Sequence, residues 1–222
     1  MSSLKALAIR AADLTLPPGF SGFFDHKSYQ LFHSEFGTHQ SPLSVFHIPP
    51  QLLDRATCED DLDWLQFIGY GVLRAITPEG SYVATYQRGK AGDEPGLHDK
   101  WSIGLGGHVD TAPEEGISLL QHLAEHTQRE LTEEVNAQFS VVQIASSLAK
   151  CQFLYAPVTK VDKVHLGMCF VLDYSACFPL TTGEPDKIKN LSWKHVGELR
   201  VMAAEGRLET WSAKLIESNI VS

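Results

Sequence analysis

The sequence predicts an α+β fold in which helices cover a mixed sheet as a sandwich. Strand-like segments come first along the chain, and helical segments are interspersed among them. Few connections are long enough to contain the crossover helix that joins two parallel strands. One long amphipathic helix is predicted at residues 117–135. We therefore expect a sheet built largely from neighbouring strands, with a few helices packed on it.

The first part of the chain predicts short elements. Residues 4–16 fit a strand that the two following prolines end, because proline cannot donate a hydrogen bond to a sheet. Residues 19–50 have no clear period and predict a loop with short strands. Pro49 and Pro50 are expected to open a short helix. Residues 58–64 then form an acidic turn or helix start.

The middle of the chain predicts a β-hairpin. Residues 67–76 and 81–88 both have the pattern of strands, and Pro-Glu-Gly forms the turn between them. A loop is expected at 91–100, followed by a short strand at 101–107 that runs into a Gly-Gly turn. After the long helix, four strands and two helices are expected. Three strands, at 141–149, 151–158 and 165–174, precede a polar loop at 181–187. A short strand at 192–196 and helices at 198–206 and 208–217 follow it.

Length and composition are those of a globular protein. The chain has 222 residues, 43% of them hydrophobic and 20% charged. This length predicts one domain with an extension, which we place at residues 61–222 and 1–60. The net charge of −9 argues against binding to a nucleic-acid duplex, which needs a basic surface. It leaves a small nucleotide-type substrate open, because metal ions offset acidic groups locally.

Cellular location is predicted from the cysteines and from hydropathy. The four cysteines form no Cys-x-x-Cys or zinc-ligand pair, which favours reduced thiols in a cytoplasmic protein. The N-terminus has no apolar signal core, and no segment reaches the ~18 apolar residues of a membrane span. We expect no membrane association.

Three glutamates near the end of the long helix are the strongest chemical signal. Glu130, Glu133 and Glu134 are spaced i, i+3 and i+4, so they fall within an arc of roughly 100° on one helix face. Such a cluster repels itself unless a cation lies in it, and Mg²⁺ or Mn²⁺ prefers carboxylate oxygens. Gly106 and Gly107 would let the backbone approach a ligand closely. A solvated acidic face is the alternative.

The same helix carries an apolar stripe beside the acids. Its members lie at helical spacing: Ile117, Leu120, Ala124, Thr127, Leu131 and Val135. The helix is thus expected to bury one flank while it presents its acids to a cleft. Asn136 follows the last apolar residue, and asparagine tolerates the left-handed conformation that ends helices.

These residues resemble the Nudix box, G-x5-E-x7-R-E-U-x-E-E-x-G-U. The matching positions are Gly107, Arg129, Glu130, Leu131, Glu133, Glu134 and Val135. The segments YQR, WSIGLGGHVD, VHLG and LETWS together resemble a subgroup of MutT-like phosphoesterases, and the likeness covers roughly residues 60–222. It implies a Nudix-type α/β/α sandwich with an N-terminal extension, and a tendency to form homodimers.

Two positions depart from the box. Its first glutamate should stand at Gln121, and an inserted loop, DTAPEEG, lengthens the segment before the helix. Asp110, Glu114 or Glu115 in that loop is expected to substitute. The closing glycine is Asn136. In the family the first glutamate mostly pairs with the box arginine, so its loss affects the loop geometry more than the chemistry.

The resemblance implies a metal-dependent hydrolase that cleaves a phosphoanhydride in a nucleoside diphosphate linked to another group. Glu134, Glu130, Glu133 and the Gly106 carbonyl would hold Mg²⁺ or Mn²⁺. Glu130 would act as the base, and Arg129 would orient the helix carboxylates. Two alternatives stay open: a weakly active or inactive Nudix-fold module that binds a nucleotide or nucleotide-sugar, and an isomerase that uses a cysteine.

Several residues outside the helix are candidates for substrate or metal contacts. Arg88 and His108 are placed to meet phosphate, although a surface ion pair and an exposed loop histidine are equally good interpretations. Glu184 is the candidate for an extra acid outside the box, and a polar turn also explains it. His122 and His126 are spaced as a zinc pair, but no third ligand is indicated.

Overall fold

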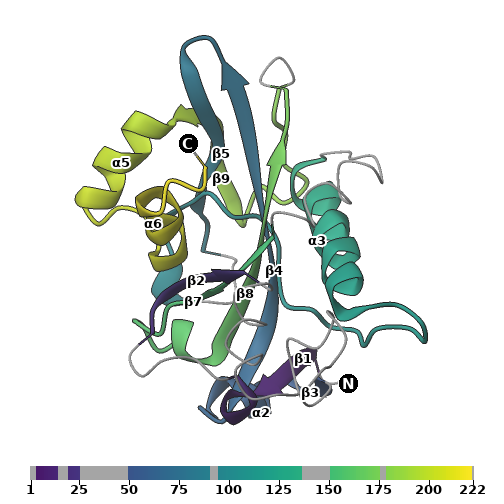
Figure 1. Ribbon diagram of the computed structural model, residues 1–222. Coiled ribbons are helices and arrows are strands. Elements are labelled where there is room, and N and C mark those ends of the chain that lie inside the picture. The colour runs from purple at the N-terminus through teal and green to yellow at the C-terminus, as the bar shows by residue number, and fades with distance from the viewer. Residues whose placement is uncertain are drawn as a thin grey trace. The chain divides into compact units, whose positions relative to one another are not determined.

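The computed structural model describes residues 4–14, 20–25, 50–90, 95–136, 151–175 and 179–221 (Figure 1). Its helices and strands are, in chain order, β1 (Lys5–Arg10), β2 (Gly22–Asp25), β3 (Gln51–Asp54), α2 (Arg55–Glu59), β4 (Trp64–Thr77), β5 (Gly80–Arg88), β6 (Trp101–Ser102), α3 (Leu119–Val135), β7 (Gln152–Tyr155), β8 (His165–Asp173), β9 (Ile188–His195), α5 (Val196–Ala204) and α6 (Thr210–Glu217). Among these elements, no helix is long and apolar enough to cross a membrane.

The chain divides into two compact units that are not continuous in sequence. Unit 1 comprises residues 1–69, 108–123 and 151–169, and unit 2 comprises residues 70–107, 124–150 and 170–222. Both β4 and β8 contribute residues to each unit. The predicted division into residues 1–60 and 61–222 follows the chain and not these units, and it stays a prediction.

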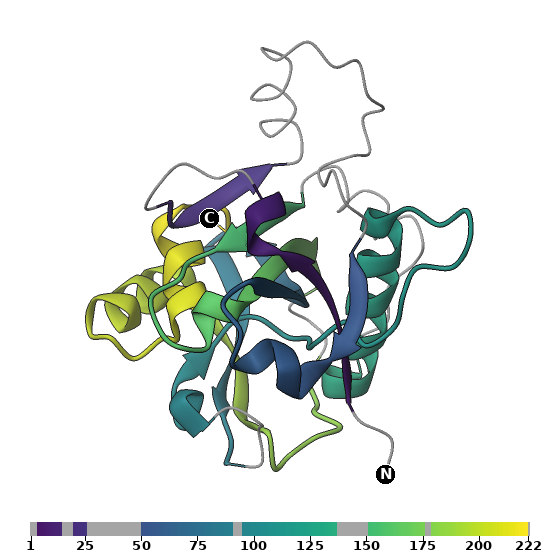
Figure 2. The same ribbon diagram turned by 90° about the horizontal axis from the view of Figure 1, so that it is seen from below.

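Unit 1 contains two sets of antiparallel strands. The first set has β1 between β3 and the beginning of β4, with Leu7 opposite Leu52 and Ile9 opposite Leu65. The second set has β7 between β2 and β8. Figure 2 shows β1 and β3 running side by side, as their register requires. The N-terminal strand is therefore held by backbone hydrogen bonds to segments far along the chain.

Unit 2 is built on a sheet in which β5 is central. The end of β4 pairs with β5, and β5 also pairs with β6 and β9, all antiparallel. A parallel bridge joins Trp101 to Leu208, which makes the pairing mixed. Figure 1 shows this sheet between the second part of α3 on one side and α5 with α6 on the other. The predicted α+β fold, a Nudix-type α/β/α sandwich with a mixed sheet, is confirmed.

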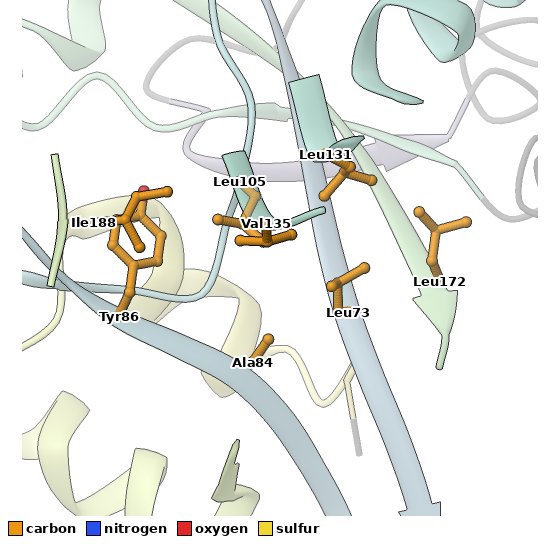
Figure 3. Close-up of a cluster of buried hydrophobic side chains, with 8 residues drawn as sticks. All are labelled: Leu73, Ala84, Tyr86, Leu105, Leu131, Val135, Leu172 and Ile188. Atoms are coloured by element: carbon orange, nitrogen blue, oxygen red, sulfur yellow. The ribbon is translucent and has the colours of Figure 1, made fainter. Parts of the chain in front are cut away.

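A buried apolar cluster attaches α3 to the sheet of unit 2 (Figure 3). Its residues come from strands, from the glycine-rich segment after β6 and from α3: Leu73, Ala84, Tyr86, Leu105, Leu131, Val135, Leu172 and Ile188. Gly71 faces this cluster, and a Cβ there would lie 2.8 Å from a methyl carbon of Leu131. Close approach of helix and strand therefore sets the position of the last turn of α3, where the acids are.

Most of the helical stripe and the C-terminal end of α3 agree with the sequence prediction, whereas the helix begins at Leu119 and not at Ile117. Leu131 and Val135 are buried, as are Ala124 and Thr127. The Ser118 hydroxyl accepts a hydrogen bond from the Gln121 N–H and so caps the first turn. Asn136 has φ 50°, the left-handed conformation expected of the residue that ends the helix.

Three sequence predictions are wrong in detail. The helix expected directly after Pro50 is strand β3 followed by α2, because residues 51–54 find a pairing partner in β1. Strand β9 begins at Ile188, earlier than expected, since it pairs along β5 as far as Arg88. The last helix begins at Thr210, because the Leu208–Trp101 bridge keeps the preceding residues extended. The predicted strand at 141–149 lies outside the described residues.

Candidate functional site

Glu134 lies in the last turn of α3 and contacts the glycine turn that follows β6. The Gly106 N–H donates a hydrogen bond to Glu134 Oε2 over 2.6 Å. Gly106 has φ 133°, in a region that side chains avoid, so only glycine points its N–H at the helix without strain. The glycine turn and the acidic helix end, which the sequence analysis assigned to one site, are therefore in direct contact.

The environment of Glu134 disfavours its charged form. Its pKa is raised to about 8, mainly by desolvation and also by the charges of Glu130 and Glu184, which together outweigh the lowering effects of the Gly106 hydrogen bond and of Arg88. A divalent cation at this position would reverse that balance, because it stabilises the ionised carboxylates. Glu134 is thus a half-buried acid whose surroundings carry more negative than positive charge.

Glu130 lies one turn before Glu134 and faces the same glycine turn. A Cβ on Gly107 would be 3.2 Å from Glu130 Oε2, so the second glycine lies directly beside that carboxylate. The other carboxylate oxygen of Glu130, Oε1, lies 3.2 Å from Arg129 Nη2 and 3.7 Å from His126 Nε2. Arg129 Nη2 also lies 2.9 Å from His126 Nδ1. The box arginine and a buried histidine thus surround one oxygen of Glu130.

The other candidate acids differ in their surroundings. Glu133 is exposed, whereas Glu184 comes from the loop that caps the end of α3. In that loop the Thr182 hydroxyl and the Gly183 N–H both donate to the Glu134 carbonyl, over 2.9 and 3.0 Å. This cap brings Glu184 close enough to affect the pKa of Glu134. The sequence indicated a polar turn here, but nothing in it showed which helix the turn caps.

Arg88 lies at the end of β5 and contacts an acid that the sequence analysis missed. Its Nη1 atom is 3.5 Å from Oε2 of Glu209, a buried residue at the start of α6. Burial lowers the pKa of Arg88, but the opposing effects of Tyr86 and Glu209 outweigh burial and hold that pKa above its usual value. Only the LETWS segment, noted as part of a family likeness, could have drawn attention to Glu209.

His108 belongs to unit 1, where its side chain lies within hydrogen-bond distance of the His165 side chain in β8. Its Nε2 atom lies 2.8 Å from Nε2 of His165, whose Nδ1 lies 2.7 Å from the Val161 carbonyl oxygen. His165 is buried, and burial lowers its pKa. His165 is therefore a hydrogen-bonded core histidine. The predicted contact of His108 with phosphate stays a prediction.

The residues at the end of α3 fit a magnesium site that is completed by water and substrate. Among the described residues, no three His, Cys, Asp or Glu side chains are grouped as a complete set of metal ligands. Mg²⁺ commonly takes only one or two carboxylates and keeps several waters or substrate oxygens. Glu134, hydrogen-bonded to the Gly106 N–H, and Glu130, beside Gly107, are two carboxylates of the kind that such a site uses.

The cysteines do not favour isomerase chemistry. Cys151 and Cys169 are buried, and burial raises the pKa of the Cys169 thiol. A catalytic cysteine needs a lowered thiol pKa, because the thiolate is the nucleophile.

Comparison with solved structures identifies the fold. Tm1382, which has been assigned to the Nudix hydrolases, superposes with a TM-score of 0.64 at 20% identity, covering 97% of this chain and 98% of Tm1382. The Nudix hydrolase from Alicyclobacillus acidocaldarius superposes with a TM-score of 0.50 at 12% identity, covering 71% of this chain and 91% of that protein. At these identities the likeness shows the Nudix fold. No family model matches the chain.

A curated relative places the chain more narrowly. Over 163 residues the chain is 31% identical to protein YmaB of Bacillus subtilis, and the match covers 73% of this chain and 75% of that protein. The chain therefore belongs to the same family as YmaB.

Proposed function

We propose that this protein is a divalent-metal-dependent hydrolase that cleaves a phosphoanhydride bond in a nucleoside diphosphate linked to another group. The observation that carries the proposal is Glu134, a half-buried carboxylate bonded to the Gly106 N–H, with Glu130 and Glu184 close enough to raise its pKa. Apart from Arg88 and the Gly106 N–H, the groups that act on Glu134 leave its negative charge uncompensated. A substrate that arrives with Mg²⁺ or Mn²⁺ would supply the missing positive charge.

The proposed roles come from the resemblance to the Nudix box and are compatible with the contacts of each residue. Glu134, Glu130 and the Gly106 carbonyl would hold the cation, with Glu133 and Glu184 as further acids. When bound, the cation neutralises phosphate charge and lowers the pKa of a bound water. Glu130 would accept the proton of the attacking water. Arg129, 3.2 Å from Glu130 Oε1, would keep that carboxylate oriented, and Arg88 would bind a phosphate oxygen.

The test is a screen of nucleoside diphosphate derivatives, with and without Mg²⁺ or Mn²⁺. The expected result is release of a mononucleotide or phosphate from at least one compound, dependent on the metal and absent in Glu134→Gln. The control is Glu198→Gln, which changes an exposed acid on α5 paired with Lys194. Metal-dependent binding of a compound without turnover would instead indicate a nucleotide-binding module. Turnover that persists in Glu134→Gln would refute the proposed metal site.

A further inference from the structure

A closed network of hydrogen bonds surrounds Glu209 at the start of α6. Its Oε1 atom accepts from the Tyr70 hydroxyl over 2.7 Å, from the Ser102 hydroxyl over 2.7 Å and from the Ser212 hydroxyl over 3.0 Å. Glu209 is 6% exposed, so these donors take the place of water. Three donors on one carboxylate oxygen occupy it fully.

The backbone holds both serines and Glu209 itself in place. The Ile103 N–H donates to the Ser212 hydroxyl over 3.0 Å, and the Gly104 N–H donates to the Ser102 hydroxyl over 3.2 Å. Each serine oxygen thus accepts from the backbone. The Ser102 hydroxyl lies 2.7 Å from Glu209 Oε1 and 3.1 Å from the Gly104 carbonyl oxygen, so the carboxylate is its nearer acceptor. The Glu209 N–H donates to the Trp101 carbonyl over 2.9 Å. The carboxylate therefore has a defined orientation, which leaves Oε2 directed at Arg88.

Arg88 is the remaining partner, and its contact with Glu209 is incomplete. The guanidinium Nη1 lies 3.5 Å from Oε2, which is an ion pair without the short geometry of a hydrogen bond. In the part of the chain that the structure describes, this is the one side-chain partner of the guanidinium. Arginine carries five N–H donors, so most of them are available to a ligand. The Arg88 side chain is 27% exposed, so a ligand can reach these donors from solvent.

Arg88 also acts on the acidic end of α3, since its charge lowers the pKa of Glu134. The charges of Glu209 and Glu134 in turn both raise the pKa of the Arg88 guanidinium. Phosphate oxygens bound near Glu134 would find N–H donors already in place. A rigid carboxylate behind a guanidinium restricts its rotamers, which reduces the entropy lost when it binds phosphate.

We propose that Glu209 is a positioning residue that holds the Arg88 guanidinium ready for a diphosphate group, so that the start of α6 forms part of the substrate site. Tyr70, Ser102 and Ser212 orient Glu209 and do not themselves contact the diphosphate. This inference rests on the proposed function, because it assigns Arg88 to the phosphates of that substrate.

The experiment measures binding of methylenediphosphonate, a non-hydrolysable diphosphate, by isothermal titration calorimetry in the presence of Mg²⁺. Arg88→Ala should weaken binding by about 10- to 100-fold, the scale of a lost charge-assisted contact. Glu209→Gln keeps the shape of the side chain and should weaken binding by a similar factor. Because the two residues act as a unit, the double variant should bind no worse than Arg88→Ala alone.

Two further variants separate positioning from folding. Tyr70→Phe removes one donor to Glu209 but keeps the ring that packs edge-on against Trp211 at 5.5 Å, and it leaves both charges in place. It should weaken binding by several-fold. Glu198→Gln, an exposed acid in the same unit, should leave binding unchanged. The melting temperature of each variant shows whether it folds, and Tyr70→Phe tests the positioning role if Glu209→Gln does not fold.

The outcomes distinguish this inference from the proposed function. Full-strength binding in both Glu209→Gln and Tyr70→Phe, with loss in Arg88→Ala, would overturn the positioning role and leave the proposed function standing. If the losses of binding free energy in Arg88→Ala and Glu209→Gln add up in the double variant, the positioning role is also overturned. Additive losses would mean that the two residues act independently. Failure of the unmodified protein to bind the diphosphate would overturn the proposed function, and this inference with it.

Discussion

Two glutamates of unit 2, Glu209 and Glu134, have opposite electrostatic surroundings. Glu209 accepts three hydroxyl hydrogen bonds and pairs with an arginine, so its charge is compensated within the chain. Glu134 accepts one backbone N–H, and its neighbours include two further acids, Glu130 and Glu184. This difference is the basis of the two roles proposed above. The compensated carboxylate is proposed to hold another side chain, and the uncompensated one is proposed to bind a cation.

The largest effect that follows from this contrast is expected in Glu134→Gln. Removing a metal ligand should reduce metal-dependent hydrolysis by about a thousand-fold or more, because the water is no longer activated. The metal-free variant should fold and melt slightly higher, since repulsion from Glu130 and Glu184 is relieved. Activity assays and thermal denaturation in EDTA measure the two effects. A variant with normal turnover would mean that the catalytic metal binds elsewhere.

Gly106→Ala tests whether the backbone contact of Glu134 matters to metal binding. Alanine at φ 133° is strained and would turn the N–H away from Glu134. Mn²⁺ affinity, measured by electron paramagnetic resonance, should fall by about 10- to 100-fold. Gly116→Ala is the matched control, because Gly116 has φ 84° and its Cβ would meet nothing. Equal losses in both variants would attribute the effect to strain alone.

Metal should stabilise the unmodified protein through Glu134. Mn²⁺ at 100 times its dissociation constant adds about 2.7 kcal/mol to the free energy of unfolding. For a chain of this size that corresponds to a rise of about 5–10 °C in melting temperature. EDTA should reverse the rise, and Glu134→Gln should show little of it. A melting temperature insensitive to millimolar Mn²⁺ would count against the site.

The last expected effect is a pH dependence of the metal-free protein. The pKa of Glu134 is raised to about 8 from an ordinary value of 4.5, so folding favours the protonated form. The stabilisation is complete below the ordinary pKa and is lost as the pH rises through about 8. In EDTA, the melting temperature of Glu134→Gln should therefore exceed that of the unmodified protein by a margin that grows from pH 5 to pH 9. A constant margin would show that Glu134 is ionised throughout.

Local sequence patterns were sufficient for much of the fold. The hairpin of β4 and β5 and the extent of α3 follow from alternation and from helical spacing. The Asn136 cap follows from the backbone tolerance of asparagine. Where an element depended on a distant partner, as β3 does on β1, the prediction was wrong, because proline and local propensity favoured a helix there. Pairing energy from the other strand decided the outcome.

The candidate site also combines features that follow from local sequence with features that depend on distant partners. The sequence by itself determined that Glu130 and Glu134 lie on one face of a helix and that two glycines precede it, because spacing and glycine are local properties. Only the tertiary structure decided that Glu134 is bonded to Gly106, that Glu133 is exposed and that the loop with Glu184 caps α3. It also decided that Glu209 faces Arg88, although the two residues are far apart in the chain. Helical periodicity carries information over a turn or two, whereas burial and charge compensation depend on which distant segments the core brings together.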